Sequence, residues 1–218
     1  MNKSDLDITI VESELKKRFL YPYQWGQKQN DFFDNQTNFI YHTFLFEDLL
    51  KEIKTRFNPE IVGNDYDKYF NYTINRWYNF WSAQAVEKIF CSLPNVSPAI
   101  DEKDHLIDFT IQGFTFDHKT SVYPKNYNKS LREAIINTDD LINWLYKNQS
   151  QEKRMHLKNR LFIVLYSTTG EAWKLKAEIT LLKKEIEYYM IGFNPHFLMK
   201  FKFEEENETL SDIIWVIK

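Results

Sequence analysis

The chain has 218 residues, long enough for one domain to bury a full hydrophobic core and too short to need a second domain. Aromatic residues make up 17% of it, which excludes intrinsic disorder and favours a well-packed interior. The net charge of −3 gives no overall attraction to nucleic acid. Any such partner must therefore be held by local basic patches or through a bound metal ion.

The cysteine content and the hydropathy limit the cellular compartments in which this protein is expected. The single cysteine, Cys91, excludes an internal disulfide and suits a reducing environment. Residues 1–20 mix acidic, basic and apolar side chains without the apolar core of a secretory signal. No stretch approaches the roughly 18 apolar residues that a membrane span needs. We expect a soluble, cytoplasmic protein with no membrane partner.

The first part of the chain is predicted to be helical. Apolar residues recur at helical spacing in three segments, 4–20, 39–57 and 65–93. Asp65 is placed to cap the third helix and Pro94 to stop it.

Glu87 is the informative residue of the third helix. Its neighbours one turn away include Gln84 and apolar side chains, and a carboxylate among them is costly to bury unless a charged group meets it. Glu87 therefore becomes a candidate ligand for a cation. The alternative is an ordinary half-exposed glutamate paired with a lysine.

The chain is organised around the segment from Leu106 to Ser121, whose Thr, Ile, Phe and Val residues predict two strands joined by a tight turn at Gln112-Gly113. In that register Ile111 faces Phe114, and Asp108 faces Asp117. Strand alternation then divides the hairpin into two faces. One carries Asp108, Thr110, Thr115, Asp117 and Lys119; the other carries Ile107, Phe109, Ile111, Phe114, Phe116 and His118.

The polar face of this hairpin predicts a divalent-metal site. Facing positions put the Cβ atoms of Asp108 and Asp117 roughly 5 Å apart. Two carboxylates so close repel unless a cation or a shared proton lies between them, and Lys119 points to the same place. The alternative is an edge hairpin whose charged side chains are merely solvated.

The rest of the chain predicts a helix, a central strand, a second helix and two further strands. The first helix is expected to begin at Asn128 or Ser130 and to run to 147. The central strand is expected over 161–166, the second helix over 171–189 and the last two strands over 197–203 and 213–217. Without a repeat or a low-complexity segment, we expect one domain over 1–218. Its parts are a helical extension (1–65), a core (66–166) and a C-terminal helix with strands (167–218).

Asp108 followed by Asp117-His118-Lys119 on the next strand resembles the PD-(D/E)xK nuclease superfamily, which includes many restriction endonucleases. In that family a proline usually precedes the first acid, whereas here it is Ile107. The resemblance covers roughly residues 82–166. It implies an α/β (α+β) fold, a restriction-endonuclease-like mixed β-sheet flanked by helices with a helical N-terminal part.

The resemblance also implies a chemistry. Mg²⁺, or Mn²⁺, would be held by Asp108, Asp117, the backbone carbonyl of His118 and Glu87, with Gln84 supporting Glu87. Lys119 would orient or deprotonate the attacking water and stabilise charge on phosphorus. We interpret the His118 side chain, on the apolar face, as a packing residue and not as a base.

Two basic groups are candidates for contact with nucleic acid. Lys125, Lys129 and Arg132 follow the hairpin, and Lys153 and Arg154 lie in a second basic stretch that reaches Arg160. Contacts of this kind position phosphates without reading sequence. Solvated surface charges are the alternative.

The function that we predict is a Mg²⁺-dependent endonuclease acting on DNA, of restriction or defence type. One alternative is a non-catalytic module that uses the nuclease fold for binding, and another is a nuclease acting on RNA or branched DNA. Whether the protein forms a homodimer is left open.

Overall fold

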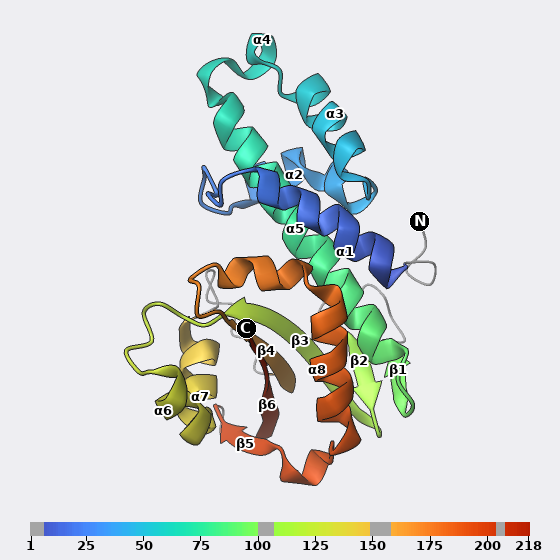
Figure 1. Ribbon diagram of the computed structural model, residues 1–218, viewed down its shortest axis with the longest axis vertical. Coiled ribbons are helices and arrows are strands. Elements are labelled where there is room, and N and C mark those ends of the chain that lie inside the picture. Colours follow the sequence, from blue (N-terminus) through green and yellow to red (C-terminus); the bar gives the residue numbers. More distant parts are fainter. Residues whose placement is uncertain (1–6, 100–106, 149–157, 204–207) are drawn as a thin grey trace. The chain divides into compact units, whose positions relative to one another are not determined.

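The computed structural model of the protein describes residues 7–99, 107–148, 158–203 and 208–218. It is a mixed α/β protein with a helical N-terminal part, followed by a six-stranded mixed sheet with flanking helices (Figure 1). The predicted fold class is confirmed at this level. Among the described residues, no helix is both long enough and apolar enough to cross a membrane.

The chain divides into two compact units. The first contains Met1–Lys88 and Lys176–Thr180, and the second contains Ile89–Leu175 and Leu181–Lys218. The expectation of one domain over 1–218 is not tested by this division and stays a prediction.

The first unit is built from helices. They are α1 (Ile8–Lys16), α2 (Asp31–Gln36), α3 (Phe46–Arg56), α4 (Pro59–Val62) and the part of α5 (Tyr66–Cys91) up to Lys88. The helix predicted over 4–20 is confirmed within the described residues, because a 3₁₀ turn continues α1 to Leu20. The helix predicted over 65–93 is confirmed by α5. The helix predicted over 39–57 is wrong in its first half. The Thr43 carbonyl accepts a hydrogen bond from Trp77 Nε1 at 2.8 Å, and Glu14 caps α3 by accepting from the Phe46 N–H at 2.8 Å.

The second unit contains the sheet, in the order β1-β2-β3-β4-β6-β5. Strands β1 to β3 form an antiparallel meander, β4 and β6 run parallel to β3, and β5 closes the edge antiparallel to β6. The predicted strands at 161–166, 197–203 and 213–217 are confirmed with shifted ends, and β1 was not predicted. The bounds are β1 (Val96–Pro98), β2 (Phe109–Ile111), β3 (Phe114–Val122), β4 (Arg160–Tyr166), β5 (Met199–Lys202) and β6 (Glu208–Ile217).

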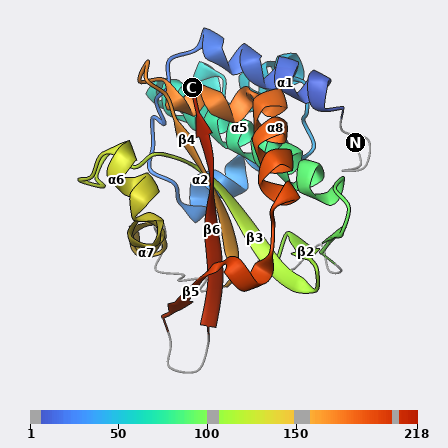
Figure 2. The same cartoon turned by 60° about the horizontal axis from the view of Figure 1, so that its bottom comes forward.

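Helices cover both faces of this sheet. Figure 2 shows α6 (Leu131–Ile136) and α7 (Thr138–Asn148) on one side of β3, β4 and β6, and α8 (Ile179–Ile191) on the other. Ser130 and Glu133 form a capping box at the start of α6, as the predicted cap requires. The single helix predicted to 147 is wrong, because the backbone leaves the helical region at Asn137 (φ −118°, ψ 61°). The helix predicted over 171–189 begins only at Ile179, after a 3₁₀ segment at Ala172–Ala177.

The hairpin that organises the chain has the predicted turn. Ile111 pairs with Phe114 and Phe109 with Phe116. Gln112 (φ 51°) and Gly113 (φ 88°) both have positive φ, which a two-residue type I′ turn requires. Phe109, Ile111 and Phe116 are buried, so the apolar face is confirmed as a core face.

The register beyond Phe109 differs from the prediction. The Asp108 N–H donates to the Phe116 carbonyl at 2.9 Å, although Phe116 is already the partner of Phe109. Two residues of one strand thus oppose one residue of the other, as in a β-bulge. The statement that Asp108 lies directly across from Asp117 is wrong, because the bulge ends the regular pairing and re-aims the Asp108 side chain.

Candidate active site

Asp108 is held by His118. Asp108 Oδ2 accepts a hydrogen bond from the His118 backbone N–H at 2.7 Å and lies 2.6 Å from His118 Nδ1. The His118 side chain is 5% exposed and its ring stacks on Phe109 with 6.0 Å between centroids. The expectation that His118 is buried on the core face is confirmed. Its partnership with Asp108 was not predicted.

Asp117 is held by a residue from the neighbouring parallel strand. Arg160, in register with Asp117, donates from Nε to Asp117 Oδ2 at 2.7 Å, and Arg160 Nη2 contacts the same oxygen. The side chains of Arg160 and Asp117 are only 11% and 19% exposed. The guanidinium carbon also lies 5.6 Å from the Tyr146 ring centroid and 5.7 Å from that of Phe162. The result is a largely buried ion pair with an aromatic wall.

Asp108 contacts residues from both faces of β3. Asp117 and Lys119 alternate with His118, and Lys119 is in register with Phe162, which packs in the core cluster against α7. His118 points to the opposite face. Because the Asp108 carboxyl is hydrogen-bonded to His118 and also interacts with the Asp117 carboxyl, it links the two faces at the end of the hairpin.

The pKa values of the two acids are pushed apart. Burial raises the pKa of Asp117; the Arg160 charge opposes this shift, and the charge of Asp108 and its hydrogen bond to Asp117 add to it. Burial also acts to raise the pKa of Asp108, but the hydrogen bonds and charge of His118 outweigh it and lower that pKa. Close carboxyls that do not ionise together are the usual cause of such a split.

Lys119 lies in the same electrostatic environment. Burial lowers the pKa of its amine and the nearby Arg160 charge lowers it further, while Asp117 acts in the opposite direction. An amine so placed gives up its proton more readily than an exposed lysine does.

The candidate site contains some of the donor atoms that a divalent cation would need. The carboxyl oxygens of Asp108 and Asp117 and the carbonyl of His118 are hard donors of the type that Mg²⁺ and Mn²⁺ prefer. Burial raises the pKa of the Asp117 carboxyl and the negative charge of Asp108 adds to that shift, so a cation between the two carboxyls would relieve their repulsion. Within the described ranges, however, no three His, Cys, Asp or Glu side chains are grouped to hold one metal ion.

Glu87 and Gln84 belong to α5 in the first unit. Glu87 was expected to need a charged partner because a carboxylate among its helix neighbours is costly to bury. One helix neighbour already binds it, since Gln84 Nε2 donates to Glu87 Oε2 at 3.2 Å. The role of Gln84 as a support for Glu87 has a contact behind it, and the role of Glu87 as a metal ligand stays a prediction.

The predicted basic residues lie away from the acids along the chain. From Lys119 to Val122, where β3 ends, the strand rises by about 10 Å, and Lys125, Lys129 and Arg132 follow that end as exposed residues. Lys129 Nζ donates to Asp140 at 2.8 Å, so this lysine already has an acidic partner. Lys153 and Arg154 lie outside the described residues.

No protein-family model, curated protein sequence or solved structure matches this chain. The candidate site therefore rests on its own geometry. Sequence reasoning missed Arg160 as a site residue because it counted that arginine among the surface charges of a basic stretch. The available signal was its position as the first residue of an apolar, buried strand, where an unpaired charge is costly.

Proposed function

We propose that this protein is a metal-dependent nuclease of the PD-(D/E)xK type, a Mg²⁺- or Mn²⁺-dependent endonuclease that hydrolyses phosphodiester bonds in DNA. The observation that carries the proposal is the hairpin itself. It brings the carboxyl groups of Asp108 and Asp117 into interaction and sets the largely buried amine of Lys119 two residues further along the same strand.

The order of the elements supports the same proposal. Helix α5 precedes the antiparallel meander β1–β3, helices α6 and α7 follow, and β4 returns parallel to β3. A restriction-endonuclease-like fold places its acids on such a hairpin inside a mixed sheet flanked by helices. The acid-x-Lys triplet Asp117–Lys119 thus occurs in the context that gives the short motif meaning.

Each residue of the site has a role in this proposal. Asp108, Asp117 and the His118 carbonyl would hold the ion, which supplies positive charge against the phosphate oxygens and activates water. Lys119 accepts a proton from the attacking water or orients it. Burial lowers the pKa of its amine and so favours the neutral form, which is the form that can accept a proton. Arg160 holds the Asp117 carboxylate in place and neutralises part of its charge.

One observation favours a second candidate, a non-catalytic binding module. Asp108 is already paired with His118, and Asp117 with Arg160. A chain that uses these acids only to brace its hairpin would need no metal. This candidate predicts that the acids stabilise the fold and that the protein binds nucleic acid without cutting it.

The experiment that tests the proposal uses the purified full chain with supercoiled plasmid, single-stranded RNA and a branched DNA, each with Mg²⁺, Mn²⁺ or EDTA. Cleavage of plasmid with either ion and not with EDTA is the expected result. Cleavage confined to RNA or branched DNA would change the substrate but keep the site. Binding without cleavage of any substrate would leave the binding module as the better account.

A further inference from the structure

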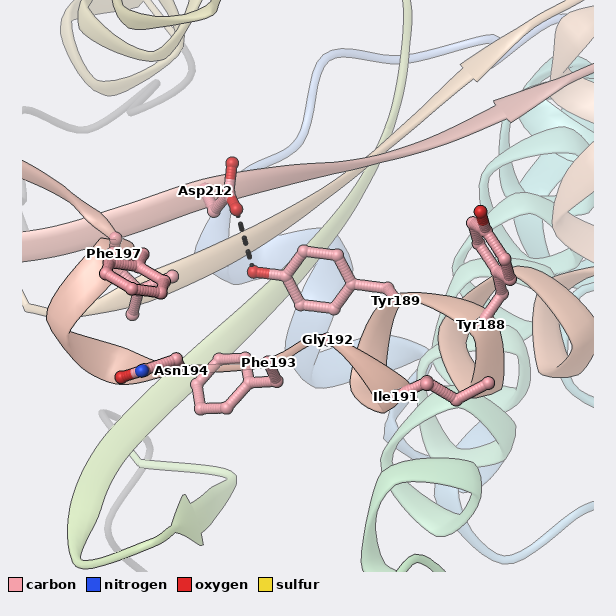
Figure 3. A pocket seen from close by; sticks show the side chains of 9 residues that line it. Tyr188, Tyr189, Ile191, Gly192, Phe193, Asn194, Phe197 and Asp212 are labelled. Atoms are coloured by element: carbon pink, nitrogen blue, oxygen red, sulfur yellow. Dashed lines mark hydrogen bonds between the residues drawn. The ribbon is translucent and has the colours of Figure 1, made fainter.

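A cavity of about 420 Å³ lies at the C-terminal end of α8, within the second unit. That volume falls in the range of roughly 300–1,000 Å³ typical of small-ligand pockets. Its wall combines the last turn of α8, the segment that follows it and one residue of β6. Figure 3 shows the Tyr189 phenol pointing from α8 to Asp212, with Phe193, Asn194 and Phe197 also around the cavity.

Asp212 supplies an acidic group in the cavity wall. Asp212 Oδ2 accepts a hydrogen bond from Tyr189 OH at 2.9 Å, and Oδ1 accepts from the Ile213 N–H at 2.8 Å. Each carboxylate oxygen has two lone pairs, so each keeps the capacity to accept one more hydrogen bond. Burial raises the pKa of Asp212, which reflects how little solvent this carboxyl has around it. A ligand that presents two adjacent donors would match the group.

The rim of the cavity is aromatic and exposed. The Phe197 side chain is 83% exposed and that of Tyr188 is 75% exposed. A patch of exposed large apolar residues beside a cavity is typical of a binding surface. Flat rings at the mouth of a cavity are suited to stacking on a flat ligand.

The cavity lies on the same face of the sheet as His118 and on the opposite face from Asp117 and Lys119. Asp212 is in register with Leu161 of β4, and Leu161 is in register with His118 of β3. Two strand spacings of about 4.8 Å therefore separate Asp212 from His118, and both residues point to the same face of the sheet. The Phe193 ring meets the ring of Phe116, the residue before Asp117, with 6.0 Å between centroids.

We propose that this cavity binds an unstacked guanine base of a single-stranded nucleic-acid segment, with Asp212 accepting from guanine N1–H and N2–H₂ and the aromatic rim stacking on the ring. The inference rests on the proposed nuclease function and adds to it a preference for a base bound on the sheet face opposite Asp117 and Lys119. Guanine fits because its Watson–Crick edge has two neighbouring donors, whereas thymine has one donor between two acceptors. Taking a base out of the stack is how proteins reach such edges.

The test measures binding of fluorescein-labelled single-stranded DNA in Ca²⁺ at mildly alkaline pH, which favours the ionised form of Asp212 because burial raises its pKa. One oligonucleotide contains a single deoxyguanosine, and its match carries deoxyinosine, which lacks only the 2-amino group. The wild-type chain should bind the deoxyguanosine strand about tenfold more tightly, as expected for one good pair of hydrogen bonds. Asp212→Asn should bind both strands equally. Phe197→Ala, a change at an exposed side chain, should weaken both by about tenfold through lost stacking.

The failure of this inference is separable from that of the proposed function, because binding and not cleavage is measured. Ile61→Ala, a change at an exposed residue of α4, serves as the matched control and should keep the full discrimination between the two strands. Equal affinity of wild type for both strands would overturn the proposal. Binding that neither Asp212→Asn nor Phe197→Ala changes would also overturn it, and loss of self-association in Phe197→Ala would then identify the aromatic rim as a protein contact.

Discussion

Arg160→Met is the change that tests the candidate site most sharply through stability. The guanidinium is the cationic partner of Asp117, and both side chains are largely buried. Removing one partner of a buried ion pair leaves the other charge without compensation and costs about 3 kcal/mol at the low end of the observed range. Methionine keeps much of the apolar contact with Tyr146 and Phe162, so little of the loss comes from packing.

The double variant Arg160→Met/Asp117→Asn separates charge from packing. With Asn at 117 no buried carboxylate is left unpaired, and the repulsion with Asp108 disappears as well. We expect the double variant to recover about 2 kcal/mol of the loss, a coupling in the range seen for contacting residues. The single variant Asp117→Asn also breaks the ion pair and leaves the Arg160 guanidinium without its carboxylate, so it should be destabilised too, but less than Arg160→Met because the repulsion with Asp108 is removed.

The assay is equilibrium unfolding in urea for wild type, both single variants and the double variant, without divalent ions and then with Mg²⁺. Added Mg²⁺ should stabilise Arg160→Met more than wild type, because no guanidinium then competes for Asp117. Losses in the two single variants that simply add in the double variant would refute the reasoning. So would an equal effect of Mg²⁺ on wild type and Arg160→Met.

Three further predictions concern the turn, a helix cap and Glu87. Gly113→Ala should lower the free energy of unfolding by about 1 kcal/mol, because Gly113 has a φ of 88° that alanine adopts only with strain. Gly192→Ala is the control, since Gly192 has an ordinary φ and open space around it, and it should leave the free energy of unfolding unchanged. Urea unfolding of both variants checks this. Ser130→Ala should cost about 1 kcal/mol in the same assay through loss of the capping box of α6. Glu87→Gln should weaken Mg²⁺ binding severalfold by calorimetry if Glu87 is a ligand, and unchanged binding would limit the metal ligands to the hairpin.

The local elements of this fold follow from sequence where short-range rules apply. Gln112-Gly113 between two apolar-patterned runs fixed the turn and the first three pairs of the hairpin, and the central strand β4 was readable from its apolar run. The break at Asn137 was not readable, because the apolar stripe continues through it. The late start of α3 depends on tryptophan side chains that are distant in sequence and bind the Thr43 carbonyl.

The candidate site shows the same division. Hairpin alternation brought Asp117 and Lys119 to one face, and it placed His118 correctly in the core. The bulge at Asp108 depends on a hydrogen bond to the Phe116 carbonyl that alternation does not reveal. The pairing of Asp117 with Arg160 requires the register between β3 and β4 across a long crossover, which no local pattern encodes. Its consequence is that one acid of the pair has its own cation.

The measurement that tests the central claim most directly compares wild type with Lys119→Ala for plasmid cleavage in Mg²⁺ and for DNA binding in Ca²⁺, with thermal melting of both proteins as the control for folding. If Lys119 acts on the attacking water, the variant should lose cleavage by at least about a hundredfold while its DNA affinity stays within a few-fold of wild type. Cleavage by the variant at the wild-type rate, or a wild type that cuts no nucleic acid with any divalent ion, would contradict the account.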